Sequence, residues 1–247
     1  CYTSGTTGNP KGVVYSHRAL VLHTYGCLMP DVMNLSAREV VMPVVPMFHV
    51  NAWSMPYGAA VVGAKLVFPG PKMGDGETLQ RLIEGEGVTV TAGVPTVWLA
   101  LLTHLDRSGT GVPSLKRVIV GGSACPRAVM EAFEQKHGVH VHHAWGMTEM
   151  SPIGTFNSPS ADFDTLSPEE QWAQRLRVGR PVYGVEVKIV DATGAELPWD
   201  GVSFGALKPS VVRLIVSAPT LLVITMIALR KSTRRPRRDR PRPPPPS

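Results

Sequence analysis

Short apolar runs alternate with longer amphipathic segments between residues 38 and 146, and this alternation constrains the fold more than any other feature. Five of the runs are typical of strands, at residues 39–45, 65–68, 88–93, 116–120 and 139–143. Three segments between them have helical spacing, at residues 77–84, 95–105 and 126–137. Strands separated by helices in this way predict an α/β fold with a largely parallel sheet.

Local signals support these elements. Pro95 and Pro126 stand where a proline is tolerated in the first turn of a helix, and Gly138 follows the third helix as a stop signal. Residues 183–190 are typical of a strand and precede a turn at residues 191–194. We expect a more β-rich part of the chain to begin there.

The net charge of +6 is carried by one end of the chain. Residues 230–247 contain eight basic side chains and one acidic side chain, a local charge of +7, so the remaining residues sum to −1. The body is therefore near neutral, which removes the support that a pI of about 9.4 would give to a nucleic-acid partner. The 43% hydrophobic content also excludes a wholly disordered chain.

The three cysteines, Cys1, Cys27 and Cys125, are far apart and form no C-x-x-C pair. This argues against a disulfide framework or a zinc site and favours a reducing compartment, so we expect a cytoplasmic protein. Because the chain begins at Cys1, inside a motif, we also expect sequence to be missing before it.

A glycine- and hydroxyl-rich segment lies at the start of the chain. Residues 3–8 hold four hydroxyl side chains and two glycines, and Lys11 follows three positions later. Glycines let backbone N–H groups approach an anion, hydroxyls add donors, and the lysine supplies a compact positive charge. Since Pro10 precedes Lys11 and Gly12 follows it, this is not the Walker A pattern, although the chemistry is that of a phosphate loop.

Residues 2–13 resemble the signature loop of the adenylate-forming enzymes, which include acyl-CoA synthetases, luciferases and peptide-synthetase adenylation domains. In that family the loop wraps the β- and γ-phosphates of ATP. Residues 144–149 (AWGMTE) resemble the family's aromatic-Gly-x-Thr-Glu motif, which implies that Trp145 lies against adenine, Thr148 bonds the α-phosphate and Glu149 holds Mg²⁺. Residues 121–126 resemble a turn of its adenine pocket. The ATP-binding residues implied are Thr3, Ser4, Gly5, Thr6, Thr7, Gly8, Lys11, Gly122, Ser123, Ala124, Trp145, Gly146, Met147 and Thr148.

Structural alternatives remain for some of these residues. Taken alone, the pair Thr148–Glu149 is also typical of a helix cap. Cys125 fits a small buried filler better than a nucleophile, because no partner motif accompanies it. The histidines at positions 140, 142 and 143 fit an ordinary strand better than a metal site, because no third ligand type is evident.

Residues 46–53 (PMFHVNAW) resemble the acyl-substrate motif of the same family. The resemblance implies acyl-binding roles for His49 at the pocket floor, Val50, Trp53 on the wall, and Gly93 before a second pocket segment. A simple core role for Trp53 is almost equally favoured. These positions offer no acidic partner for a substrate amine, so an apolar acid is expected rather than an amino acid. The closest resemblance is to medium- and long-chain fatty-acyl-CoA synthetases.

The resemblance implies that ATP and a fatty acid give an acyl-adenylate and pyrophosphate, and that coenzyme A then forms the thioester. Lys11, Thr148 and Glu149 would carry the catalytic roles, with Mg²⁺ on Glu149. Two alternatives stay open: a membrane-tethered, non-catalytic module that binds nucleotide or acyl groups, and an adenylate-forming ligase for an aryl acid.

The resemblance covers residues 1–208, which we expect to be part of the large N-terminal domain of such an enzyme, with mixed sheets layered with helices. The ribose-binding Asp, the hinge and the C-terminal subdomain of the family have no counterpart here, so we expect the isolated chain to be inactive. Residues 209–247 form an atypical tail, with an uncharged run at 214–229 followed by Arg and Pro. We favour a shifted reading frame as its origin, over an anchor giving peripheral membrane association.

Overall fold

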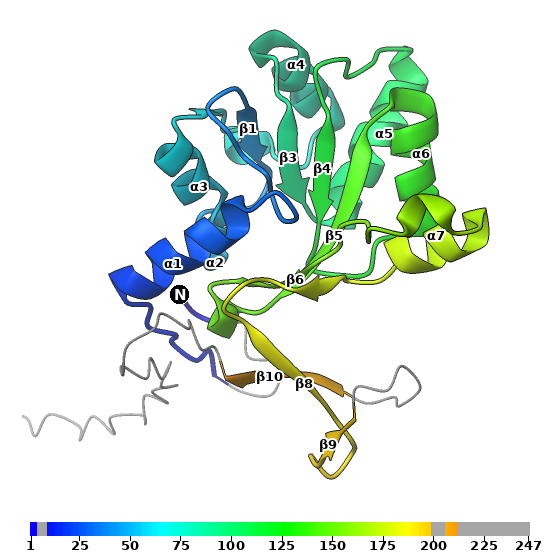
Figure 1. Ribbon diagram of the computed structural model, residues 1–247. Coiled ribbons are helices and arrows are strands. Elements are labelled where there is room, and N and C mark those ends of the chain that lie inside the picture. The colour runs from blue at the N-terminus through cyan, green and yellow to red at the C-terminus, as the bar shows by residue number, and fades with distance from the viewer. Residues whose placement is uncertain (4–8, 199–205, 212–247) are drawn as a thin grey trace, which may run out of the picture.

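The computed structural model describes residues 1–3, 9–198 and 206–211, and Ser4 to Gly8 of the predicted phosphate loop therefore lie outside the described residues, as do residues 212–247 of the tail. A seven-stranded sheet forms the centre of the molecule (Figure 1). Its strands, from one edge to the other, are β2 (Lys65–Leu66), β1 (Val40–Pro43), β3 (Val90–Gly93), β4 (Arg117–Val120), β5 (His140–Gly146), β6 (Ile153–Phe156) and β7 (Arg180–Pro181). The first five strands run parallel, and β6 and β7 are antiparallel to their neighbours.

Helices cover both faces of this sheet (Figure 1). One face packs against α4 (Gly76–Glu86), α5 (Pro95–Ser108) and α6 (Arg127–His137), and the other against α1 (His17–Leu28) and α3 (Met55–Val62). The shorter helices are α2 (Val50–Trp53), α7 (Pro168–Arg175), η1 (Gly70–Lys72), η2 (Thr148–Met150) and η3 (Phe163–Thr165). This arrangement confirms the α/β prediction.

The sheet has a hydrophobic core on each of its two faces, because successive side chains of a strand point to opposite faces. Along β4, Val118 and Val120 point into the core beneath α4, α5 and α6, whereas Ile119 between them points into the core beneath α1 and α3. All three side chains are buried. A strand that is buried on both faces is apolar along its whole length, which is why these strands could be predicted from short apolar runs in the sequence.

The predicted helices form with the expected start and stop signals. Asp75 caps α4 by accepting a hydrogen bond from the Thr78 amide at 2.9 Å, and Gly87 ends that helix at φ 68°. Pro95 occupies the first turn of α5, and Gly138 ends α6 at φ 67°. The limits of these three helices are therefore encoded by local residues.

A second, three-stranded antiparallel sheet follows, with the order β10 (Ala206–Val211), β8 (Glu186–Val190) and β9 (Glu196–Leu197). It is the β-rich part expected after residue 183. Strand β10 pairs with β8 from Ala206 opposite Val190 to Val211 opposite Glu186, with a register shift between Pro209 and Val211. Within the residues that the structure describes, no helix combines the length and apolarity that crossing a bilayer requires.

The backbone between Val50 and Ser54 is unusual. Five successive non-glycine residues have φ between 49° and 63°, so α2 is a left-handed turn rather than a right-handed helix. This conformation costs of order 1–2 kcal/mol per residue for L-amino acids and persists only where the surroundings hold it. Here the buried side chains of Val50, Ala52 and Trp53 hold it against the core.

Candidate functional site

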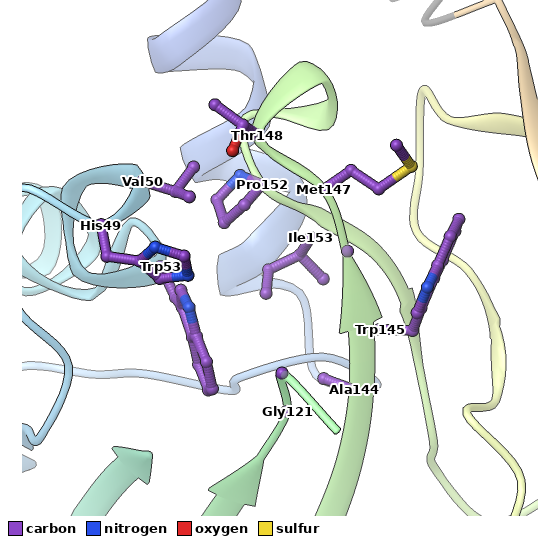
Figure 2. Close-up of a pocket in the computed structure, with 12 residues that line it drawn as sticks. His49, Val50, Trp53, Gly121, Ala144, Trp145, Met147, Thr148, Pro152 and Ile153 are labelled. Atoms are coloured by element: carbon purple, nitrogen blue, oxygen red, sulfur yellow. The ribbon is translucent and has the colours of Figure 1, made fainter. Parts of the chain in front are cut away.

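A cavity of about 240 Å³ opens where the parallel strands end (Figure 2). The chain segments that follow β1 and β4 meet the end of β5 there, as the topology of an open α/β sheet favours for ligand sites. Figure 2 shows His49, Val50 and Trp53 on one side of the cavity and Trp145 with Met147 on the other. The lining residues are His49, Val50, Trp53, Gly121, Gly122, Ala144, Trp145, Gly146, Met147, Thr148, Pro152 and Ile153.

The Trp53 indole lines the cavity and is 95% buried, and its acyl-binding role stays a prediction. The indole packs against the turn formed by Gly121 and Gly122. A Cβ added to Gly121 would lie 3.1 Å from Trp53 Cη2, and Gly122 has a φ of 80° that favours glycine. The two glycines therefore let the indole approach the backbone at the end of β4 and set the depth of the cavity.

Gly93 is not among the residues that line this cavity, in contrast to the acyl-binding role that the resemblance implied for it. It is buried, and its carbonyl accepts a hydrogen bond from the Trp98 indole at 3.1 Å. A Cβ on Gly93 would lie 2.8 Å from Trp98 Cζ2. The structure thus gives Gly93 a packing role behind the site.

A second cavity of about 530 Å³ lies on the other side of the glycine turn. Ser123, Ala124 and His143 line it, and the segment 176–178 forms its outer wall. Four residues line both cavities and so form a common wall, namely Gly122, Ala144, Trp145 and Gly146. The residues expected to bind adenine thus come together around the second cavity, and His49, Val50 and Trp53 come together around the first.

Sequence reasoning missed the outer wall of the second cavity, because residues 176–178 carry no motif. Buried side chains hold its backbone carbonyls. Asn157 Nδ2 donates to the carbonyls of Gln174 and Arg177, both at 2.7 Å, and Thr155 Oγ1 donates to the Val178 carbonyl at 2.7 Å. His143 Nδ1 lies 3.2 Å from the Leu176 carbonyl. The wall is therefore fixed to β5 and to the end of β6.

Helix α7 leads into this wall and is held by an aromatic stack. The guanidinium groups of Arg127 and Arg175 lie 4.8 Å and 4.6 Å from the centre of the Trp172 ring. Each contact is a cation–π interaction. Because Arg127 belongs to α6, the stack joins α7 to the main helical layer.

The turn after β5 carries the predicted Thr148 and Glu149. Gly146 is required at its start, because a Cβ there would lie 2.1 Å from the Pro152 carbonyl oxygen. The Met147 amide donates to the same carbonyl at 3.0 Å and closes the turn. Thr148 lines the first cavity, and its side chain is visible at the upper edge of Figure 2. Glu149 is half-buried beside it.

The two ends of the glycine- and hydroxyl-rich segment are described by the structure and lie together. The Thr3 amide donates to the Lys11 carbonyl at 2.9 Å, and Tyr2 pairs with Gly12 in an antiparallel bridge. The Lys11 side chain is exposed. Backbone pairing therefore holds the two described ends together, and Lys11 lies exposed at the second of them.

Magnesium is the metal that the predicted chemistry needs. Within the described residues, His, Cys, Asp and Glu side chains nowhere gather in a group of three that could cage a metal ion. Mg²⁺ is commonly held by one or two carboxylates together with substrate phosphates and water, so a single half-buried carboxylate at Glu149 fits this mode.

Among the three histidines of β5, His142 Nδ1 is bonded to the Asn157 carbonyl at 2.9 Å, and burial lowers the pKa of His142 to about 4.

The cysteines have structural positions. Cys1, Cys27 and Cys125 are all free, and the latter two are buried. Burial raises the pKa of Cys125 to about 11, which keeps its thiol protonated. The interpretation of Cys125 as a buried filler is confirmed.

Comparisons with known proteins agree with this geometry. The model of the AMP-binding enzyme family matches residues 1–208. The chain is 58% identical over 207 residues to the medium-chain-fatty-acid–CoA ligase of Ectopseudomonas oleovorans and 55% identical over 207 residues to the 3-methylmercaptopropionyl-CoA ligase of Ruegeria lacuscaerulensis. Each alignment covers 84% of this chain and 38% of the relative, so the chain spans less than half the length of the curated relatives it matches.

The fold comparison leads to the same group. The crystal structure of a long-chain-fatty-acid-CoA ligase from Archaeoglobus fulgidus matches with a TM-score of 0.65 and 26% identity, over 79% of this chain and 38% of that one. The expected fold, a part of an adenylate-forming enzyme, is confirmed. The chain belongs to the family of AMP-binding enzymes.

Proposed function

We propose that this chain holds ATP and a fatty acid side by side for adenylation of the carboxylate, as part of an acid–thiol ligase that forms acyl-CoA. The observation that carries the proposal is the common wall of the two cavities. The adenine base would occupy the cavity lined by Ser123 and Ala124, and the acyl chain the cavity lined by His49 and Trp53. The reacting groups would then meet beside Gly146 and Thr148.

In the proposed step a carboxylate oxygen bonds to the α-phosphorus, the bond from that phosphorus to the bridging oxygen breaks, and pyrophosphate leaves with the electron pair. Both reactants are anions, so their repulsion has to be offset. Lys11 would neutralise phosphate oxygens, with a charge-assisted bond of about 1.5–3 kcal/mol. The Thr148 hydroxyl would donate to the α-phosphate, and Glu149 would hold Mg²⁺, which supplies charge neutralisation when it is bound.

The chemistry of the first cavity supports an apolar acid as the substrate. Val50, Trp53 and Ile153 supply apolar surface, and no Asp or Glu is among the described residues that line it. An amino-acid substrate would leave its ammonium group without a partner there, which is costly in a partly dry site. The relatives named above for medium-chain fatty acids and for 3-methylmercaptopropionate also take acids with an uncharged tail. Coenzyme A would be the thiol acceptor.

Equilibrium binding to the 247-residue chain tests the proposal. Isothermal calorimetry should detect a non-hydrolysable octanoyl-adenylate, in which a sulfamate replaces the phosphate, and should detect ATP in the presence of Mg²⁺. Lys11→Ala should weaken ATP binding about tenfold or more, because a charge-assisted contact is lost. Lys72→Ala is the matched control, since Lys72 lies in η1 away from both cavities.

Two results would contradict the proposal. One is equal binding of ATP by the unsubstituted chain and by Lys11→Ala. The other is tighter binding of a benzoyl-adenylate than of the octanoyl compound, which would favour an aryl-acid ligase.

A further inference from the structure

The turn between β5 and β6 is fastened by three side chains from distant parts of the chain. The Tyr15 hydroxyl donates to the Thr148 carbonyl, Ser54 Oγ donates to the Ser151 carbonyl at 3.0 Å, and the Ile153 amide donates to His23 Nε2 at 3.2 Å. Each contact takes up a backbone group of the turn. Met147, Thr148 and Pro152 of the turn line the first cavity, whereas Met150 is buried in the core beneath α1 and α3.

Tyr15 differs from the other two, because its own segment is the exit of the glycine- and hydroxyl-rich loop. The Val13 amide donates to the Cys1 carbonyl at 2.7 Å, and the Cys1 amino group donates to the Val13 carbonyl at 3.0 Å. Lys11 and Val13 therefore belong to one paired backbone segment, and Tyr15 stands two residues beyond it. The connection from Lys11 to Thr148 thus runs along the backbone to Tyr15, four positions later, and then through the Tyr15 side chain to the Thr148 carbonyl.

We propose that Tyr15 is a positioning residue that sets Lys11 and the Thr148–Glu149 pair at a fixed separation for the polyphosphate and its Mg²⁺. This inference rests on the proposed function. Tyr15 touches neither cavity, so its effect would pass through the Thr148 carbonyl. Burial raises the pKa of the Tyr15 hydroxyl well above its usual range and the charge of Glu149 raises it further, so the hydroxyl keeps its proton as a donor and lies near that carboxylate.

The phosphate side and the base side of the site should respond differently to loss of this hydroxyl. The outer wall of the second cavity is held by hydrogen bonds from Thr155, Asn157 and His143, and the Tyr15 hydroxyl takes part in none of them. Loss of the Tyr15 hydroxyl should therefore weaken ligands that carry phosphates with Mg²⁺ and should spare adenosine. A role confined to folding would affect both ligands alike.

The test compares Tyr15→Phe with the unsubstituted 247-residue chain by calorimetry. Mg·ATP should bind about fivefold more weakly, as expected for loss of one hydrogen bond, and adenosine should bind unchanged. The Mg²⁺ concentration needed for half-saturation at fixed ATP should rise. Ser54→Ala, which frees the neighbouring Ser151 carbonyl, should shift Mg·ATP binding in the same direction. Tyr25→Phe, on the exposed side of α1, is the control.

Each outcome decides between the alternatives. Equal loss of adenosine and Mg·ATP binding in Tyr15→Phe, or no loss of either, would overturn the positioning role and leave the proposed function intact. Failure of the unsubstituted chain to bind Mg·ATP would refute both the proposed function and this inference. Thermal unfolding followed by circular dichroism shows whether Tyr15→Phe is folded. If it is not, the comparison of Mg·ATP binding with adenosine binding is made in Ser54→Ala instead.

Discussion

Protonation of His23 should destabilise this protein in mild acid. His23 lies in α1, is 96% buried, and its Nε2 accepts the Ile153 amide at 3.2 Å. An imidazolium cannot accept that hydrogen bond, and burial lowers the pKa of His23 to about 4. Cys27 Sγ lies 3.3 Å from His23 Nε2, and burial raises the pKa of this thiol to about 12, so Cys27 offers no negative charge.

The direction and size of the effect follow from these values. The pKa in the folded protein is about 4, below the ordinary value of 6.5, so the unfolded chain binds a proton first as the pH falls. The stabilisation is complete above pH 6.5 and is lost as the pH falls toward 4. The full shift corresponds to about 3 kcal/mol, and about 2 kcal/mol of it is lost between pH 7.5 and pH 5.

Urea unfolding at pH 7.5, 6 and 5 measures this loss when the unsubstituted chain is compared with His23→Gln. The glutamine amide oxygen can still accept from Ile153 but does not titrate, and effects of the carboxylates are common to both proteins. The difference in unfolding free energy between the two proteins should change by about 2 kcal/mol from pH 7.5 to pH 5. Parallel pH curves, or a His23 ring that titrates near pH 6.5 in the folded protein by NMR, would refute the reasoning.

Three further substitutions have defined outcomes. Gly146→Ala should lower the unfolding free energy by about 3 kcal/mol and abolish octanoyl-adenylate binding, because its Cβ meets the Pro152 carbonyl; Gly74→Ala, which meets nothing, should match the unsubstituted chain in urea unfolding and calorimetry. Ser151→Gly should raise the free energy of unfolding by about 1 kcal/mol, because Ser151 has φ 74° and its buried hydroxyl lacks a hydrogen-bond partner among the described residues. A lower free energy of unfolding in urea would contradict this. Trp172→Ala should cost about 2 kcal/mol in urea unfolding through loss of both cation–π contacts, whereas Trp172→Phe should retain most of the stability, and equal losses would contradict the stacking argument.

The elements that could be predicted from sequence are those whose burial is apolar and periodic. Helices α4, α5 and α6 place leucine, isoleucine, methionine and phenylalanine at helical spacing, and the central strands are apolar on both faces. Helix α1 was not predicted, because its buried face consists of small and polar residues such as Ala19, His23, Thr24 and Cys27. Helix α7 has no buried residue at all and depends on the capping box of Ser167 and on the Trp172 stack.

The same distinction holds for the site. Motif residues such as Trp53, Trp145 and Thr148 were assigned to one site because their motifs resemble those of a known family, and in the structure all three line one cavity at the carboxyl ends of the parallel strands. The left-handed turn at Val50–Ser54 contains no glycine, so nothing in its composition indicated positive φ values. The fastening of Thr148 by Tyr15 joins positions 133 residues apart, and no local pattern encodes such a contact.

That separation has a consequence for how the protein acquires its binding ability. The three contacts that fasten the turn after β5 join residues 133, 97 and 130 positions apart, whereas neighbouring parallel strands are joined over far shorter distances. Contacts of long sequence separation require most of the chain to be ordered before they form. Nucleotide binding would therefore appear only with the last cooperative step of folding, and a collapsed intermediate that already contained the sheet would not bind. A nucleotide would bind only to the complete fold, so its presence during refolding would raise the population of that fold relative to partly folded forms.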